Sequence, residues 1–128
     1  MDALRRRVPY GHSVAANTNG KVYGRAPGAG KWRLKAAGVL PNATSAPDGT
    51  NYVTYTLKNA AGTTIGSFTT ASTGLTAGTY RGFTFTASVN PEFDGDGTDV
   101  VEVSIDKSGT GVAVAGYVEL EWESVQAA

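Results

Sequence analysis

The sequence predicts an all-β fold: a single antiparallel β-sandwich, jelly-roll-like, with an extended N-terminal arm. Three observations lead to this class. The 128 residues match the size of one compact domain. Seventeen glycines, with abundant threonine, valine and alanine, favour strands and tight turns over helices. Apolar and polar residues alternate with a period of two in several segments, whereas no segment shows a convincing helical period.

The first segment, residues 1–30, is predicted to be a basic arm and loop, and residues 31–128 the sandwich domain. Glycine, proline, asparagine and arginine recur over residues 1–30 without a sustained period. One or two short strands fit within this stretch, but we expect most of it to be extended arm or loop.

Four segments after the arm alternate most clearly and are predicted to be strands with one buried face. The residues expected to face the core are Trp32, Leu34 and Ala36 in KWRLKA; Val53, Tyr55 and Leu57 in YVTYTLK; Val101, Val103 and Ile105 in DVVEVSIDK; and Val112, Val114, Val118, Leu120 and Trp122 in VAVAGYVELEWES.

Two further segments predict weaker strands. TTIGSFTT has Gly66 between Ile65 and Phe68, which indicates a β-bulge at the glycine. GTYRGFTFTASV places Phe83, Phe85 and Ala87 on one face. The total is seven or eight strands, and several loops are too long for a simple meander, which favours a jelly roll.

The composition excludes several classes of protein. The chain has no cysteine, which rules out a disulfide scaffold, thiolate catalysis and a cysteine-based zinc site. The start, MDALRRRVPYGHSV, lacks the apolar stretch of a signal peptide, so we expect a soluble protein that is made in the cytoplasm and has no targeting signal. The apolar runs are too short to span a bilayer, so no membrane partner is expected.

Charge is unevenly distributed although the formal net charge is zero. Residues 1–35 hold eight basic and one acidic residue, whereas residues 36–128 hold three basic and ten acidic residues. This asymmetry has two interpretations. The basic N-terminal segment binds a partner different from that of the acidic remainder, or the two parts neutralise each other within one fold or oligomer.

FDGDGTD, residues 93–99, resembles a calcium-binding loop at first sight. A loop of the EF-hand type that started at Asp94 would need glycine at the position of Asp99 and glutamate at that of Ile105. The template fails, and Asp-Gly pairs suit a turn between two strands. A looser calcium site built from loop carbonyls stays open as a minor alternative, and no metal or cofactor is predicted.

GRAPGAGKW, residues 24–32, resembles a phosphate-binding loop. That motif needs glycine where Arg25 stands and a hydroxyl where Trp32 stands. The sequence after it is strand-like, so no helix N-terminus would face a phosphate. We interpret the stretch as a flexible loop that enters a strand.

Catalytic residues are sparse, and the protein is predicted not to be an enzyme. His12 is the single histidine and lies in the expected arm. The carboxylate pair of a glycosidase could come from Glu119, Glu121 and Glu123. These three residues are, however, expected on the solvent-facing side of one strand. We interpret them as charges that protect a sheet edge from pairing.

RRRVPY, residues 5–10, is the predicted partner-binding site. We expect this extended segment to order on an acidic protein surface and to place Val8 and Tyr10 in a groove. The acidic body and the lack of a neighbouring aromatic platform argue against nucleic acid. A solvated terminus is the alternative. The predicted binding residues are Arg5, Arg6, Arg7, Val8, Pro9 and Tyr10.

The C-terminal half resembles a known family in its general sequence pattern. The stretch in question is FTFTASVNPEFDGDGTDVVEVSIDKSGTGVAVAGYVELEW. Residues 50–124 resemble the jelly-roll cement, or decoration, proteins of podovirus capsids of the epsilon15-type group. The resemblance implies a structural virion protein that binds the outside of a phage capsid and cements neighbouring major capsid protein subunits. It also implies a homo-oligomer, a dimer or a trimer, located on the capsid surface.

A carbohydrate-binding or receptor-binding β-sandwich of a phage tail or head fibre is the alternative function. Such modules stack exposed aromatic rings on sugar rings. The candidates by strand phase are Tyr23, Tyr52, Tyr80 and Tyr117, and the sequence does not show whether they share a face.

Overall fold

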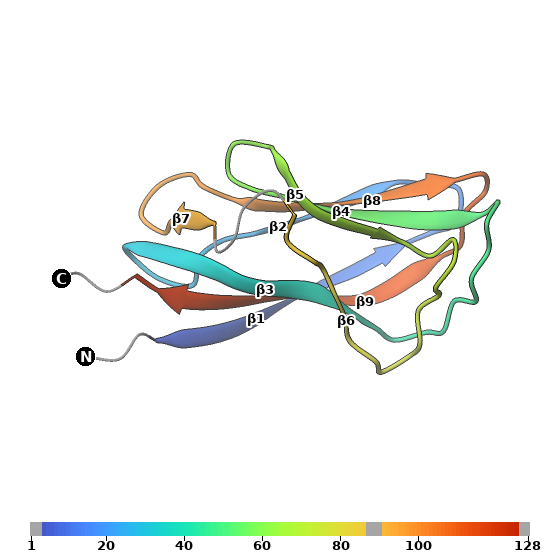
Figure 1. Cartoon of the computed structure of the whole chain (residues 1–128), viewed down its shortest axis with the longest axis horizontal. Coiled ribbons are helices and arrows are strands. Elements are labelled where there is room, and N and C mark those ends of the chain that lie inside the picture. The colour runs from blue at the N-terminus through green and yellow to red at the C-terminus, as the bar shows by residue number, and fades with distance from the viewer. Residues whose placement is uncertain (1–3, 87–90, 126–128) are drawn as a thin grey trace.

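The computed structural model describes residues 4–86 and 91–125, and the secondary structure of these residues consists of nine strands. The strands lie in two antiparallel sheets packed face to face (Figure 1). Their bounds are β1 (Arg5–Val14), β2 (Gly20–Gly24), β3 (Lys31–Pro41), β4 (Tyr52–Lys58), β5 (Thr64–Thr69), β6 (Arg81–Gly82), β7 (Glu92–Asp94), β8 (Val101–Ser108) and β9 (Val114–Ser124). The prediction of an all-β sandwich is confirmed.

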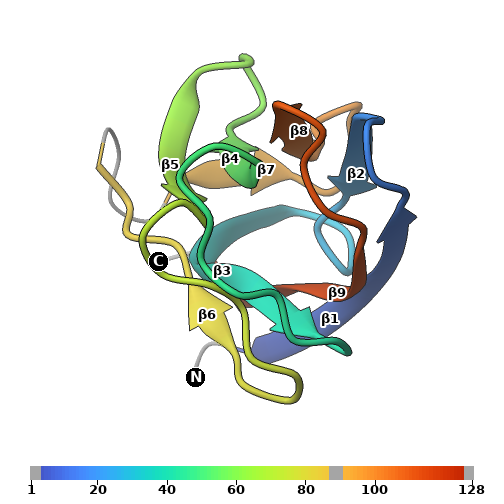
Figure 2. The same cartoon turned by 90° about the vertical axis from the view of Figure 1, so that its right-hand side faces the viewer.

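The strand order is that of a jelly roll. Sheet A runs β1-β9-β3-β6, with β7 paired to the other end of β3, and sheet B runs β2-β8-β4-β5. The pairs β1–β9, β2–β8, β3–β6 and β4–β5 are nested as in one long hairpin that turns between β4 and β5. Rolling up this hairpin brings β9 against β3 and β8 against β4. Figure 2 shows the two layers end-on.

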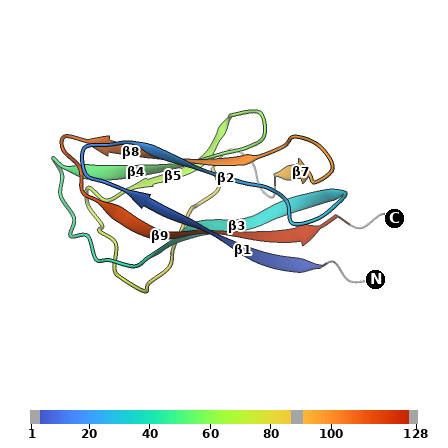
Figure 3. The ribbon, with the colours of Figure 1, turned by 180° about the vertical axis from the view of Figure 1, so that it is seen from behind.

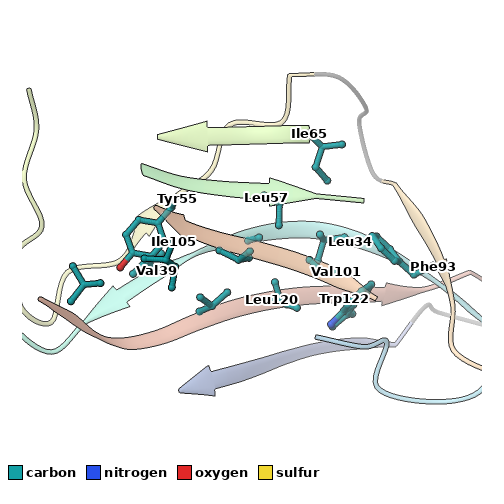
Figure 4. Close-up of a cluster of buried hydrophobic side chains, with 14 of the residues drawn as sticks. Leu34, Val39, Tyr55, Leu57, Ile65, Phe93, Val101, Ile105, Leu120 and Trp122 are labelled. Atoms are coloured by element: carbon teal, nitrogen blue, oxygen red, sulfur yellow. The ribbon is translucent and has the colours of Figure 1, made fainter. Parts of the chain in front are cut away.

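The core lies between the sheets and consists of alternate residues from each strand (Figure 4). Val53, Tyr55 and Leu57 of β4 are fully buried, as predicted. In sheet A, the ring of Trp122 meets that of Phe93 edge-to-face at 5.3 Å. Each large apolar side chain buried in this way contributes roughly 1.5–3 kcal/mol to folding.

The buried face of β3 differs from the prediction at one residue. Trp32 and Leu34 are buried as expected, but the register with β9 shifts between Leu34 and Ala36. The extra residue at this bulge is Lys35, and it reverses the phase of the strand. Ala37 therefore faces the core instead of Ala36.

The expected N-terminal arm instead contributes two strands, β1 and β2, to the sandwich, which corrects the prediction over the described residues 4–30. β1 pairs with β9 along ten residues without a register shift, and β2 pairs with β8 in the opposite sheet. Val8, Tyr10 and Val14 recur on the inner face of β1 and pack against the core. The period of two is present, but His12 interrupts its apolar series.

The strand expected over residues 78–89 is reduced to β6, because the chain leaves sheet A there. Phe83 N donates a hydrogen bond to Ala37 O in sheet A, and Thr86 N donates one to Ile65 O in sheet B, both at 2.8 Å. A segment that crosses between the sheets cannot follow either ladder. Ala87, also expected in this strand, lies outside the described residues.

The bulge predicted at Gly66 is confirmed to within one residue. Leu57 pairs with Gly66 and Lys58 with Thr64, so Ile65 is the extra residue on β5. Ile65 is fully buried, and the bulge turns its side chain into the core.

Candidate functional site

The predicted partner-binding residues Arg5–Tyr10 all lie on β1, but they do not point the same way. Val8 and Tyr10 face the interior and pack against the core. The Tyr10 hydroxyl donates to Arg25 O at 3.2 Å and accepts from Arg25 N at 3.1 Å. In this conformation neither side chain is available to fill a partner's groove, because the protein's own core already holds both.

The arginines on the outer side of β1 pair with the glutamates of β9. Arg5 Nη2 lies 3.1 Å from Glu123 Oε2, and Arg7 Nη1 lies 3.4 Å from Glu119 Oε1. Arg7 also reaches Glu121 at 4.0 Å. The antiparallel register causes this pairing, since it sets Arg5 opposite Glu123 and Arg7 opposite Glu121.

The interpretation of these glutamates as edge protection is wrong. β9 lies between β1 and β3, so its carboxylates stand in the middle of sheet A. From the β3 side, Arg33 lies 3.9 Å from both Glu123 and Glu92. The resulting outer surface has a central row of glutamates with arginines on both sides.

These ion pairs explain much of the uneven charge distribution in the sequence. The basic N-terminal residues and the acidic C-terminal strand neutralise each other within one sheet, which was one of the two alternatives. The side chains of Arg5 and Arg7 are 59% and 51% exposed, so each pair contributes only about 0–1 kcal/mol.

Arg6 is the remaining exposed positive charge of the triplet. Its side chain forms no ion pair with the part of the chain that the structure describes, and Nη1 donates to Arg5 O at 3.3 Å. It lies at the start of β1, where the first three residues of the strand are exposed.

The edge of β1 that faces away from β9 is open. Ser124 N donates to Leu4 O at 2.8 Å, so the even-numbered residues of β1 direct their backbone groups toward β9. The odd-numbered residues direct theirs outward. Pro9 is one of these, and it has no N–H to leave unpaired. Proline and neighbouring charges are common protection for an exposed edge.

The structure divides the four candidate tyrosines between the two outer faces. Tyr80 and Tyr117, 37% and 47% exposed, lie on the outer face of sheet A. Tyr23 on β2, 55% exposed, and Tyr52 on β4 belong to the outer face of sheet B. At most two of these four tyrosines can therefore share one face.

Tyr80 reaches its position through the connection between β5 and β6. Its ring lies on Gly38 of β3, where any Cβ would collide with ring atom Cζ. The Arg7 guanidinium is 5.5 Å from the ring centroid, within range of a cation–π contact. Burial raises the pKa of Tyr80; Arg7 opposes this shift, and Glu119 and Glu121 add to it.

The two loops that resembled ligand-binding motifs contact each other. Gly30 N donates to Asp96 Oδ2 at 2.9 Å, and Gly95 N donates to Gly30 O at 2.7 Å. Within the acidic loop, Asp94 N donates to Asp99 Oδ2 and Asp96 N donates to Asp94 Oδ1, each at 2.8 Å. The carboxylates thus accept hydrogen bonds from backbone amides. The acidic residues are therefore explained by their part in forming the turn.

Among residues 4–86 and 91–125, no group of three or more histidine, aspartate or glutamate side chains is arranged so that it could hold a metal ion. An open depression of about 250 Å³ lies beside the acidic loop. Its lining mixes one cation with three carboxylates and a ring: Lys31, Glu92, Asp94, Asp99 and Phe93.

His12 joins the two sheets. Its Nε2 lies 3.1 Å from the hydroxyl of Tyr55, and the two rings meet edge-to-face at 5.8 Å. Nδ1 is buried and has no hydrogen-bond partner among the described residues. Burial lowers the pKa of His12 and raises that of Tyr55. Because neither nitrogen contacts a carboxylate, the histidine lacks the acidic partner of a catalytic triad.

Comparison with protein-family models, with curated proteins and with solved structures gives no match. The described residues contain no helix with the length and apolar character needed to cross a membrane. The resemblance to capsid decoration proteins therefore stays a prediction, and the residues and their geometry carry the functional argument.

Proposed function

We propose that the protein is a structural virion protein that binds the outside of a phage capsid and cements neighbouring major capsid protein subunits. The observation that carries the proposal is the open edge of β1, with Arg6 exposed beside it. This edge and this charge can meet an acidic surface without any rearrangement of the jelly roll. The texture of residues 50–124 and the strand order agree with such a role.

The proposed mechanism is stabilisation by mass action. A protein that binds across the joint between two subunits stabilises the assembled shell in proportion to its occupancy. Many copies on a symmetric lattice, or a dimer or trimer that engages several joints, add modest contacts into a large effect. The proposal needs no catalytic step, cofactor, nucleic acid or membrane.

The test is co-sedimentation of the purified protein with capsids of the parent virus. Deleting residues 1–10 is unsuitable, because Val8 and Tyr10 pack on the core. Arg6→Glu is the better variant, since Arg6 has no ion pair among the described residues to lose. We expect the wild type to sediment with capsids and Arg6→Glu to bind at least roughly tenfold more weakly.

Arg25→Glu is the matched control. Arg25 is also exposed, it lies in the loop after β2, and its side chain forms no ion pair among the described residues. Both variants change the net charge equally, so normal binding by Arg25→Glu assigns the effect to the position of Arg6. The result that would contradict the proposed function is wild-type protein that stays in the supernatant when it is mixed with capsids that carry none of it beforehand.

A further inference from the structure

The outer face of sheet A has an aromatic half in addition to its half with ion pairs. Tyr117 of β9 lies between Gly11 of β1 and Leu40 of β3 in the strand register. Its ring atom Cε1 would stand 4.0 Å from a Cβ at Gly11, so the missing side chain leaves that side of the ring uncovered. Tyr80 lies on Gly38, two residues from Leu40 along the same strand.

Polar groups border the two rings. Arg7 lies beside Tyr80 and binds Glu119, the residue that pairs with Gly38 beneath the ring. Arg7 and Glu119 are held by each other, so they offer donors and acceptors in a fixed arrangement. Groups that are already ordered lose less conformational entropy when a ligand binds.

The charges on this face are paired with one another, which indicates the charge of the ligand. Arg5, Arg7 and Arg33 pair with the glutamates of β9, and Arg33 also lies 3.9 Å from Glu92 of β7. An ion of either sign would have to compete with these existing ion pairs. A neutral molecule with many hydroxyl groups finds both donors and acceptors beside two aromatic rings.

We propose that the outer face of sheet A around Tyr80 and Tyr117 binds a neutral oligosaccharide. The ring of Tyr117 stacks on the apolar face of one sugar unit, the exposed part of the Tyr80 ring packs against the next unit, and Arg7 and Glu119 bond to hydroxyls between them. The places of the two rings are roughly 7 Å apart along the strand direction, which suits at least two linked sugar units. This activity goes beyond capsid binding and uses a different surface from the edge of β1.

The test is titration of the full chain with cello-, malto-, xylo- and mannohexaose, and with polygalacturonate as an anionic probe, followed by saturation-transfer NMR. We expect one or more neutral hexaoses to bind and polygalacturonate not to bind. Tyr117→Ala and Tyr80→Ala should each weaken binding roughly tenfold, because each removes one aromatic contact with the sugar.

Tyr23→Ala is the matched control, since Tyr23 is also an exposed tyrosine but lies on the outer face of sheet B. It should bind like the wild type, as should Arg6→Glu, which separates this site from capsid binding. Tyr117 is on the surface, so its loss should leave the unfolding temperature unchanged. Failure of all four neutral hexaoses, binding of polygalacturonate alone, or an equal loss in Tyr23→Ala would overturn the proposal.

Discussion

The two long sides of the sandwich are closed in different ways. On the side of β5 and β6, the chain itself crosses from sheet A to sheet B over residues 83–86 and hydrogen-bonds to both. On the side of β1 and β2, no comparable crossing strand covers the described edges, and side chains tie the sheets together (Figure 3). These ties are the bonds of Tyr10 with Arg25 and of His12 with Tyr55.

The difference is the reason why the proposed partner is placed on the side of β1 and β2. The crossing segment fills the first side with Phe83, whose ring lies 5.0 Å from that of Phe68. The second side leaves outward backbone groups on β1 and protects them with Pro9 and arginines alone. The proposed binding edge thus lies on the side that lacks a crossing segment.

The largest expected effect is on the closed side. In Gly66→Val the new Cβ would stand 2.8 Å from Thr84 O and 3.4 Å from Phe83 Cβ, so the crossing segment must shift. We expect the free energy of unfolding to fall by about 2 kcal/mol in chemical denaturation. Gly49→Val is the control, because nothing lies within 4 Å of a Cβ there. Equal losses in the two variants would show that the crossing segment is not tightly packed.

A smaller change in the free energy of unfolding is expected when the pH is lowered, and it comes from His12 on the open side. Burial lowers the pKa of His12 below its usual 6.5, so the unfolded chain takes up a proton before the folded chain does. The free energy of unfolding should therefore be constant above about pH 6.5 and fall as the pH drops below it. Chemical denaturation at pH 7.5, 6.5 and 5.5 measures this slope.

His12→Phe supplies the comparison for the acid effect. The chain has no other histidine, and carboxylates titrate mainly at lower pH. The variant should be insensitive to pH over this range. A slope that persists in His12→Phe would assign the effect to another group and remove His12 as a pH-dependent tie between the sheets.

The smallest effect on stability is expected for Pro9→Val. Pro9 directs its backbone away from β9, so the substitution breaks no bond of the ladder and should change the free energy of unfolding by less than about 0.5 kcal/mol. It does restore an outward N–H on an open edge. We expect increased self-association in sedimentation velocity. Monodisperse behaviour equal to the wild type would mean that the edge is covered by other means.

The sequence predicted the fold class and most of the core but not the role of β1. The strands that begin at Tyr52, Val101 and Val114 are predictable because apolar and polar residues alternate along them. β1 is not predictable as a strand, because Pro9, Gly11 and His12 weaken its pattern. The open edge explains the proline and the contact with Tyr55 explains the histidine, but nothing in the structure requires glycine at position 11.

The outer face of sheet A could not be predicted from the chain, because distant segments build it. Arg7 and Glu119 are 112 residues apart and meet only through the β1–β9 register. Tyr80 lies on Gly38 through a loop whose path depends on the β3–β6 pairing. Local patterns identify which residues face outward but not which of them become neighbours.

Amide hydrogen exchange of residues 5–14, followed by NMR, tests most directly whether β1 is an integral strand with one open edge. The account predicts alternation: slow exchange at Arg6, Val8, Tyr10 and His12, which bond to β9, and fast exchange at Arg5, Arg7, Gly11 and Ser13. Fast exchange at all of these residues would contradict the account and show that residues 5–14 form a free arm. Slow exchange at all of them would mean that a second strand already covers the edge.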